Sequence, residues 1–106
     1  MSDFEGLATV AFQIIAAVGN ARSLYIEAIQ EAKAGNFDRA KELIEEGERS
    51  FLVGHDAHTK LVQAEAKGDP TQMCLMLTHA EDQLMSAEAF GILASEFVDV
   101  YKRFEA

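Results

Sequence analysis

The last part of the sequence contains a helical pattern with two apolar faces, and this feature limits how the chain can fold. The pattern begins at Asp69-Pro70, where Asp69 can cap a helix and Pro70 suits its first turn, and it continues nearly to the C-terminus. At about 100° per residue, apolar residues recur along two separate stripes. The first stripe contains Met73, Leu77, Ala80, Leu84, Ala87, Gly91 and Val98, and the second contains Leu75, His79, Asp82, Ser86, Phe90, Leu93, Phe97, Val100 and Phe104.

The second apolar stripe predicts an oligomer. A chain of 106 residues forms a single domain, 1–106, and its other helices can cover only one face of the last helix. We therefore expect a neighbouring copy of the chain to cover the second stripe, with Phe90, Leu93 and Phe97 in the interface. The narrow strip that the pattern assigns to solvent consists of Glu81, Glu88, Glu96, Asp99 and Arg103.

Two further helices are expected before this one. Apolar residues keep the helical period from about Phe4 to Ala34 and again from about Phe37 to Ala66. Gly35-Asn36 ends the first helix, since glycine suits the left-handed position after a helix end, and Lys67-Gly68-Asp69-Pro70 forms the second turn. Short connections favour antiparallel neighbours, so the sequence predicts an all-α, antiparallel up-down-up three-helix bundle.

The charge balance argues against several classes of partner. The chain has 18 acidic and 9 basic residues, and no basic stripe is available to neutralise nucleic acid phosphates or an anionic membrane. Cys74 is the only cysteine, so neither an intrachain disulfide nor a thiolate metal cluster is expected. The N-terminus lacks the basic segment of a signal peptide, and no continuous apolar run is long enough to span a bilayer. We therefore expect a cytoplasmic protein without direct membrane insertion.

Ionisable residues in unexpected positions are the candidates for chemistry. His79 and Asp82 interrupt the second apolar stripe three residues apart and therefore point the same way. Taken alone, such a histidine is more often hydrogen-bonded than reactive. His55 and His58 share one helix face, as metal ligands often do, but no third ligand is visible nearby, so packing or hydrogen bonding is the favoured interpretation. Arg22 is expected to form an ion pair on the helix surface.

The string around His79 resembles the signature of a known family. His79-Ala80-Glu81-Asp82-Gln83-Leu84-Met85 is similar to the His-Ala-Gln-Asp-His-Leu-Met signature of enzyme IIA components of the lactose/cellobiose (chitobiose) class of the bacterial sugar phosphotransferase system. Three other segments resemble the same family in order along the chain: Gly19-Asn20-Ala21-Arg22-Ser23 its Ala-Gly-x-Ala-Arg-Ser, Gly35-Asn36-Phe37 its Gly-Asp-Phe turn, and the segment from His55 to Ala66 its His-x-x-Gln-Thr-x-Leu-Ile-Gln-x-Glu-Ala. The resemblance covers essentially the whole chain.

The resemblance implies a small helical phosphocarrier. In that family a histidine accepts a phosphoryl group from the carrier protein HPr and passes it to a cysteine of a sugar-specific IIB domain, and the IIC permease imports the sugar as it is phosphorylated. By alignment of the motif, the phosphorylated residue is His79. The permease recognises the sugar, so lactose, cellobiose and diacetylchitobiose all remain open. A neutral imidazole is a suitable nucleophile near neutral pH, and the absence of a Gly-rich phosphate loop indicates that the donor is a protein.

The resemblance also implies a homotrimer with Asp82 at its axis. Three converging carboxylates about 4 Å apart repel by roughly 4 kcal/mol per pair at an effective dielectric near 20. Such a cluster can hold protons or bind a hard divalent cation through its oxygens. Since the family uses this aspartate for a cation, we expect a structural Mg²⁺ at Asp82.

Two positions depart from the family pattern, and two other classes of protein stay open. His58 replaces a glutamine and Gln83 replaces the second histidine of the signature, so the sequence assigns neither residue a catalytic role. One alternative is a histidine-phosphotransfer domain of a two-component relay, although its usual His-x-Leu-Lys-Gly signature is missing after His79. The other is a non-catalytic helical metal-binding or assembly protein that uses His55, His58 and His79.

Overall fold

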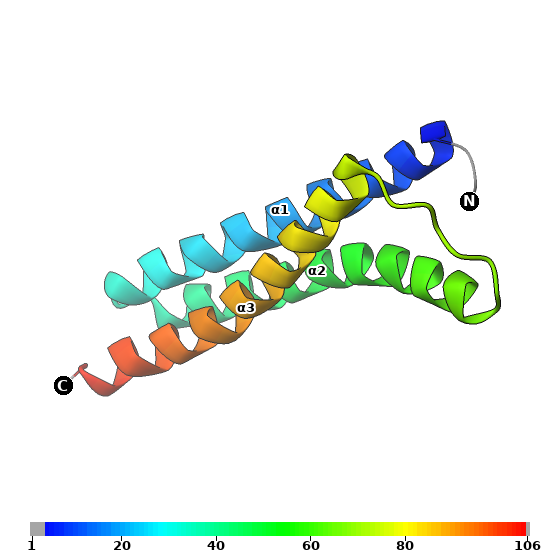
Figure 1. Ribbon diagram of the computed structural model, residues 1–106. Coiled ribbons are helices and arrows are strands. Elements are labelled where there is room, and N and C mark those ends of the chain that lie inside the picture. The colour runs from blue at the N-terminus through cyan, green and yellow to red at the C-terminus, as the bar shows by residue number, and fades with distance from the viewer. Residues whose placement is uncertain (1–3, 106) are drawn as a thin grey trace.

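The computed structural model describes residues 4–105, which form three long helices (Figure 1). Helix α1 spans Phe4–Lys33, α2 spans Phe37–Ala66 and α3 spans Leu75–Arg103. Consecutive helices run antiparallel, and the described part of the chain contains no strand. The predicted all-α, up-down-up fold is confirmed, and the first two helices end within one residue of the predicted bounds.

Helix α1 is the central element of the bundle, because it packs extensively against both α2 and α3 while those two touch each other much less. Its buried residues recur every three or four positions, the spacing that keeps them on one helix face. They are Leu7, Ala11, Ile14, Val18, Ala21, Tyr25, Ala28 and Ala32. Half of these side chains are alanine, so the neighbouring helices can approach α1 closely there.

The composition of α1 has a second consequence. Among the described helices, α1 alone is long and apolar enough to cross a membrane, although no continuous apolar run marks it in the sequence. Core helices of soluble proteins pass the same test. In this fold the buried face of α1 packs against the other two helices, which is the arrangement of a core helix.

The ring of Tyr25 is enclosed by a glycine from each neighbouring helix. A Cβ atom at Gly47 of α2 would lie 2.5 Å from Cε1 of Tyr25, and one at Gly91 of α3 would lie 2.9 Å from its Cζ. The two glycines therefore make room for the ring at the centre of the bundle. Burial raises the pKa of the Tyr25 hydroxyl above its ordinary value of 10.0, and the nearby carboxylate of Glu48 adds to the effect.

Both turns contain a glycine in the left-handed conformation, at φ 86° for Gly35 and 93° for Gly68. After α1, the amide of Asn36 donates to the carbonyl of Glu31 at 2.9 Å, which closes the helix end. After α2, the amide of Asp69 donates to the carbonyl of Ala64 at 3.0 Å in the same way. The expected helix end at Gly35 is confirmed, and α2 ends in the same way at Gly68.

Helix α3 begins at Leu75, so the predicted start at Asp69-Pro70 is wrong. The amide of Asp69 closes the end of α2, and the chain then crosses the bundle to reach the side of α1 (Figure 1). An extended chain advances about 3.3 Å per residue and a helix only about 1.5 Å, so the extended segment reaches farther than a helix of the same length. Cys74, at φ −142° and ψ 166°, keeps the extended conformation up to the first turn of α3.

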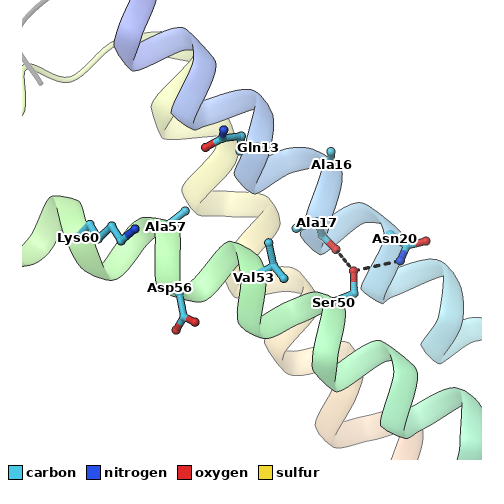
Figure 2. Close-up of a pocket in the computed structure, with 9 residues that line it drawn as sticks. All are labelled: Gln13, Ala16, Ala17, Asn20, Ser50, Val53, Asp56, Ala57 and Lys60. Carbon is cyan, nitrogen blue, oxygen red and sulfur yellow. Dashed lines mark hydrogen bonds between the residues drawn. The ribbon is translucent and has the colours of Figure 1, made fainter.

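Polar side chains tie α1 to α2 near the middle of the bundle. The hydroxyl of Ser50 donates to the backbone carbonyl of Ala17 at 2.7 Å, and Nδ2 of Asn20 donates to the Ser50 oxygen at 3.0 Å (Figure 2). Because Ser50 reaches a carbonyl on α1, this link fixes the register between the two helices. Helix α1 continues without a break through the neighbouring Gly19.

Candidate functional site

The outward face of α3 is apolar and uncovered. We call this face the outer stripe; its exposed members are Leu75, His79, Asp82, Leu93, Phe97, Val100 and Phe104. Leu75 is 85% exposed, and Leu93 and Phe97 are 54% and 46% exposed. The chain's own helices therefore leave this stripe open, as the sequence predicts. Phe90 differs from the prediction, because it packs inside the protomer beside Tyr25 and Ala94.

His79 lies in the second turn of α3 with its side chain exposed. On the other side of the helix, Leu77 and Ala80 are 1% and 0% exposed, so they hold this turn against the bundle. No hydrogen bond or ion pair found between residues 4 and 105 involves His79. The imidazole is thus presented on a rigid helix and is open to an incoming protein.

Asp82 follows His79 by three residues and is also exposed on the outer stripe. Over the described residues, no group of three or more His, Cys, Asp or Glu side chains gathers closely enough to hold a metal ion. Within one chain, Asp82 therefore lacks partner ligands. A cation at Asp82 would require carboxylates from further copies, which is the arrangement that the family resemblance implies.

Arg22 contacts α3 one turn beyond His79. Its Nη1 donates to Oε1 of Gln83 at 2.6 Å, and the contact is partly buried between α1 and α3. The prediction of a surface ion pair for Arg22 is wrong, because its partner is a neutral amide on another helix. The physical reason is the rotation of α1, which turns Arg22 towards α3 and not towards solvent.

His58 and Glu81 form a second link between helices, joining α2 to α3 with Nε2 and Oε1 3.0 Å apart. Glu81 is half-buried, so its predicted place on the solvent strip is wrong. His55 instead lies against the ring of Phe51, with centroids 5.9 Å apart. At about 100° per residue, Glu81 points about 160° away from His79 around α3, so the three histidines do not converge on one site.

A groove with a volume of about 780 Å³ lies elsewhere, between α1 and α2 (Figure 2). Its lining residues are Gln13, Ala16, Ala17, Asn20, Ser50, Val53, Asp56, Ala57 and Lys60. Neither His79 nor Asp82 is among them. The candidate nucleophile thus lies outside this groove, on an open helix face.

Sequence reasoning missed both links between helices. The partner of Arg22 could have been suspected from two signals: Arg22 is the only basic residue before Lys33 in α1, and Gln83 follows His79 by one helical turn. The pairing of His58 with Glu81 has no such signal. It depends on how α2 and α3 are rotated against each other.

Known proteins resemble this chain over nearly its whole length. Residues 9–102 match a family model described as PTS system, Lactose/Cellobiose specific IIA subunit. The chain is 39% identical over 93 residues to the oligo-beta-mannoside-specific EIIA component of Bacillus subtilis, covering 88% of this chain and 84% of that one. It is 36% identical over 94 residues to the lactose-specific EIIA component of Streptococcus mutans, covering 89% and 90%. The crystal structure of the cellobiose-specific enzyme IIA from Bacillus anthracis superposes with a TM-score of 0.89 at 40% identity, covering 92% and 89%.

Proposed function

This chain belongs to the lactose/cellobiose-specific IIA family of the sugar phosphotransferase system, and we propose that His79 is the residue on which it carries the phosphoryl group. The donor is the phosphohistidine of HPr, and the acceptor is the cysteine of a sugar-specific IIB domain. The IIC permease then imports the sugar as it is phosphorylated. We place the protein in the cytoplasm, where both exchange partners can reach it. Membership of this family makes it a phosphotransferase component and favours this role over a two-component relay domain.

The observation that carries the proposal is the position of His79. It lies within the string that resembles the family signature, on an open face of α3, with buried Leu77 and Ala80 behind it. Transfer between carriers depends mainly on positioning and charge stabilisation, so an exposed, rigidly mounted imidazole is sufficient. An enclosed pocket would hinder two successive protein partners.

The chemistry balances without a cofactor. The lone pair of a ring nitrogen of His79 attacks phosphorus while the other ring nitrogen keeps its proton. The phosphorus–nitrogen bond to the histidine of HPr breaks, and its electron pair stays on the departing imidazole. In the second transfer the thiolate of the IIB cysteine attacks phosphorus, and His79 leaves as a neutral imidazole.

We further propose that three chains assemble through the apolar part of the outer stripe around Leu93 and Phe97, with His79 at the rim of the interface, where both exchange partners reach it. An apolar face that includes Leu93 and Phe97, both about half exposed in the protomer, is expected to be covered by a partner. Around a threefold axis the three Asp82 carboxylates converge and provide the hard oxygen ligands that Mg²⁺ prefers. The ion would neutralise the carboxylates and stabilise the trimer, and it takes no part in phosphoryl transfer.

The sugar does not follow from this chain. Relatives of similar identity are named for different sugars: oligo-beta-mannoside at 39%, lichenan at 35% and lactose at 36%. Identity over most of the chain therefore does not separate these specificities. We propose that the permease makes the choice.

The test is incubation with phosphoenolpyruvate, enzyme I and HPr, followed by intact mass measurement. The parent chain should gain one acid-labile phosphoryl group, and His79→Gln should fold normally and gain none. His55→Gln is the matched control, because it removes an exposed histidine from α2, and it should be labelled like the parent. Full labelling of His79→Gln would show that another residue accepts the group.

A further inference from the structure

The contact between α1 and α3 beside His79 has chemical properties that the proposed function does not use. Arg22 donates to Gln83 at 2.6 Å, in a partly buried position. We propose that Arg22 and Gln83 together bind the phosphoryl oxygens once His79 is phosphorylated. This inference rests on the proposed function, and it names residues that act in it beyond the nucleophile.

The charge of Arg22 is uncompensated. The chain has twice as many acidic as basic residues, 18 against 9, yet Arg22 pairs with a neutral amide. Within the described part of the chain, no ion pair involves Arg22. By contrast, Arg39 at the other end of the bundle lies 3.1 Å from the carboxylate of Glu42. Arg22 therefore keeps a full positive charge available for an anion.

Helix α3 needs that charge if it is to carry a phosphoryl group. Between Leu75 and Tyr101, α3 contains no lysine or arginine, and two acidic residues, Glu81 and Asp82, lie within three positions of His79. A phosphoryl group adds close to two negative charges there. Arg22 is the arginine that a described hydrogen bond places against this part of α3.

The hydrogen bond also orients the amide of Gln83. Arginine is a donor without acceptor atoms, so its partner must be the amide oxygen. The NH₂ group of Gln83 then points away from Arg22 with two N–H donors. The pair thus offers donors from both side chains, and oxygen atoms of a phosphoryl group are the acceptors that such donors suit.

The helical spacing places these donors beside His79. Residues four apart on a helix are neighbours on its surface, with Cβ atoms about 5–6 Å apart and side chains about 40° apart around the axis. Gln83 follows His79 by four residues, so its amide lies next to the imidazole along α3. The guanidinium of Arg22 donates to the oxygen of that amide. A phosphoryl group on His79 can therefore accept hydrogen bonds from the pair without a rearrangement of the helices.

This pairing also gives a role to a position where the chain departs from the family pattern. Gln83 stands where the family signature has its second histidine. A protonated histidine there would repel Arg22, whereas the glutamine oxygen accepts a hydrogen bond from it. The glutamine therefore holds the cation in place while supplying uncharged donors of its own.

The experiment measures the equilibrium of phosphoryl groups between HPr and each variant, by intact mass at fixed concentrations. Charge-assisted hydrogen bonds contribute enough that Arg22→Gln should lower the ratio of phosphorylated to free chain at least about tenfold. Gln83→Glu should lower it by a similar factor, because the new carboxylate neutralises Arg22. Arg39→Gln removes the same charge at the other end of the bundle and should stay within about twofold of the parent.

Gln83→Glu separates phosphoryl binding from a structural role. A new ion pair between a glutamate and Arg22 keeps the link between the helices, so the melting temperature should not fall. If this variant keeps its melting temperature and is phosphorylated like the parent, that result overturns the inference.

The inference and the proposed function fail in different ways. A parent chain that gains no phosphoryl group, or a His79→Gln variant that does, overturns the proposed function and this inference with it. A parent labelled on His79, with unchanged equilibria for Arg22→Gln and Gln83→Glu, overturns only the inference.

Discussion

The two faces of α3 differ sharply although they share one helix. The inner face carries Leu77, Ala80, Leu84 and Ala87, none more than 6% exposed, and it closes the bundle against α1. The outer stripe is equally helical and largely apolar, but it stays open and carries His79 and Asp82. The inner face thus stabilises the fold of one chain, whereas the outer stripe remains available for contact with other molecules.

This difference indicates on which face of α3 a reactive histidine can lie. A histidine on the inner face would have to satisfy its nitrogens in a core and would be closed to partners. On the outer face His79 keeps its access, and it takes rigidity from the buried residues behind it.

The largest effect is expected from a charge on the outer stripe. Leu93→Glu should abolish the trimer, because burying an unpaired carboxylate in each interface costs several kcal/mol. Leu93 is 54% exposed in the protomer, so the monomer should keep its helical circular dichroism. Sedimentation of parent and variant at micromolar concentration checks this. A Leu93→Glu protein that still sediments as a trimer would contradict the proposed interface.

A matched pair of truncations compares the faces directly. Leu77→Ala, at a side chain 1% exposed, should lower the free energy of unfolding by about 2–5 kcal/mol. Leu75→Ala, two residues earlier and 85% exposed, should leave the stability of the protomer nearly unchanged. Denaturant unfolding in the Leu93→Glu background measures the protomer alone. Equal losses for both variants would mean that the two faces are not distinct.

Metal removal tests the centre of the outer stripe. If Mg²⁺ at about 100 times its Kd stabilises the trimer through Asp82, a chelator should remove about 2.7 kcal/mol of stability. Asp82→Leu should be insensitive to chelator and at least as stable as the parent, because the carboxylate repulsion is gone. Thermal melts with and without chelator decide this. A parent unaffected by chelator, with an Asp82→Leu variant that falls apart, would indicate a specific hydrogen bond instead.

The smallest effect is expected where the inner side of α3 meets Tyr25. Gly91→Ala adds a Cβ 2.9 Å from the ring, which Gly47 confines on its other side, so overpacking should cost about 1–3 kcal/mol. Gly19→Ala is the control, since its Cβ meets nothing within 4 Å and alanine is the better helix former. Chemical denaturation of both variants should show opposite signs. A neutral Gly91→Ala would mean that the ring can move.

Much of the fold could be predicted because an amphipathic helix shows its period within a short stretch of sequence. The apolar period located α1 and α2 to within a residue, and it separated Leu77 and Leu84 from Leu93 and Phe97. The start of α3 was mispredicted, since Asp69 and Pro70 form a good capping sequence wherever they occur. Only the distance that the chain must cross to reach α1 shows that these residues have to be extended.

The candidate site could likewise be predicted only in part. His79 was identified from a string of neighbouring residues, and its exposure follows from its place on the outer stripe. The hydrogen-bond partners of Arg22 and His58 could not be predicted from neighbouring residues. Arg22 is 61 positions from Gln83, and His58 is 23 positions from Glu81. Nothing in a local pattern joins residues so far apart.

Helical periodicity in the sequence is enough to predict three amphipathic helices, a last helix with two apolar faces, and a histidine on one of these faces. The tertiary structure decided which side chains meet: Arg22 with Gln83, and Tyr25 with Gly47 and Gly91. The physical reason is that the same helix face recurs about every 3.6 residues, so residues close in the sequence are enough to reveal it. Contacts between helices depend instead on rotation, register and side-chain length, which are fixed only when all three helices pack together.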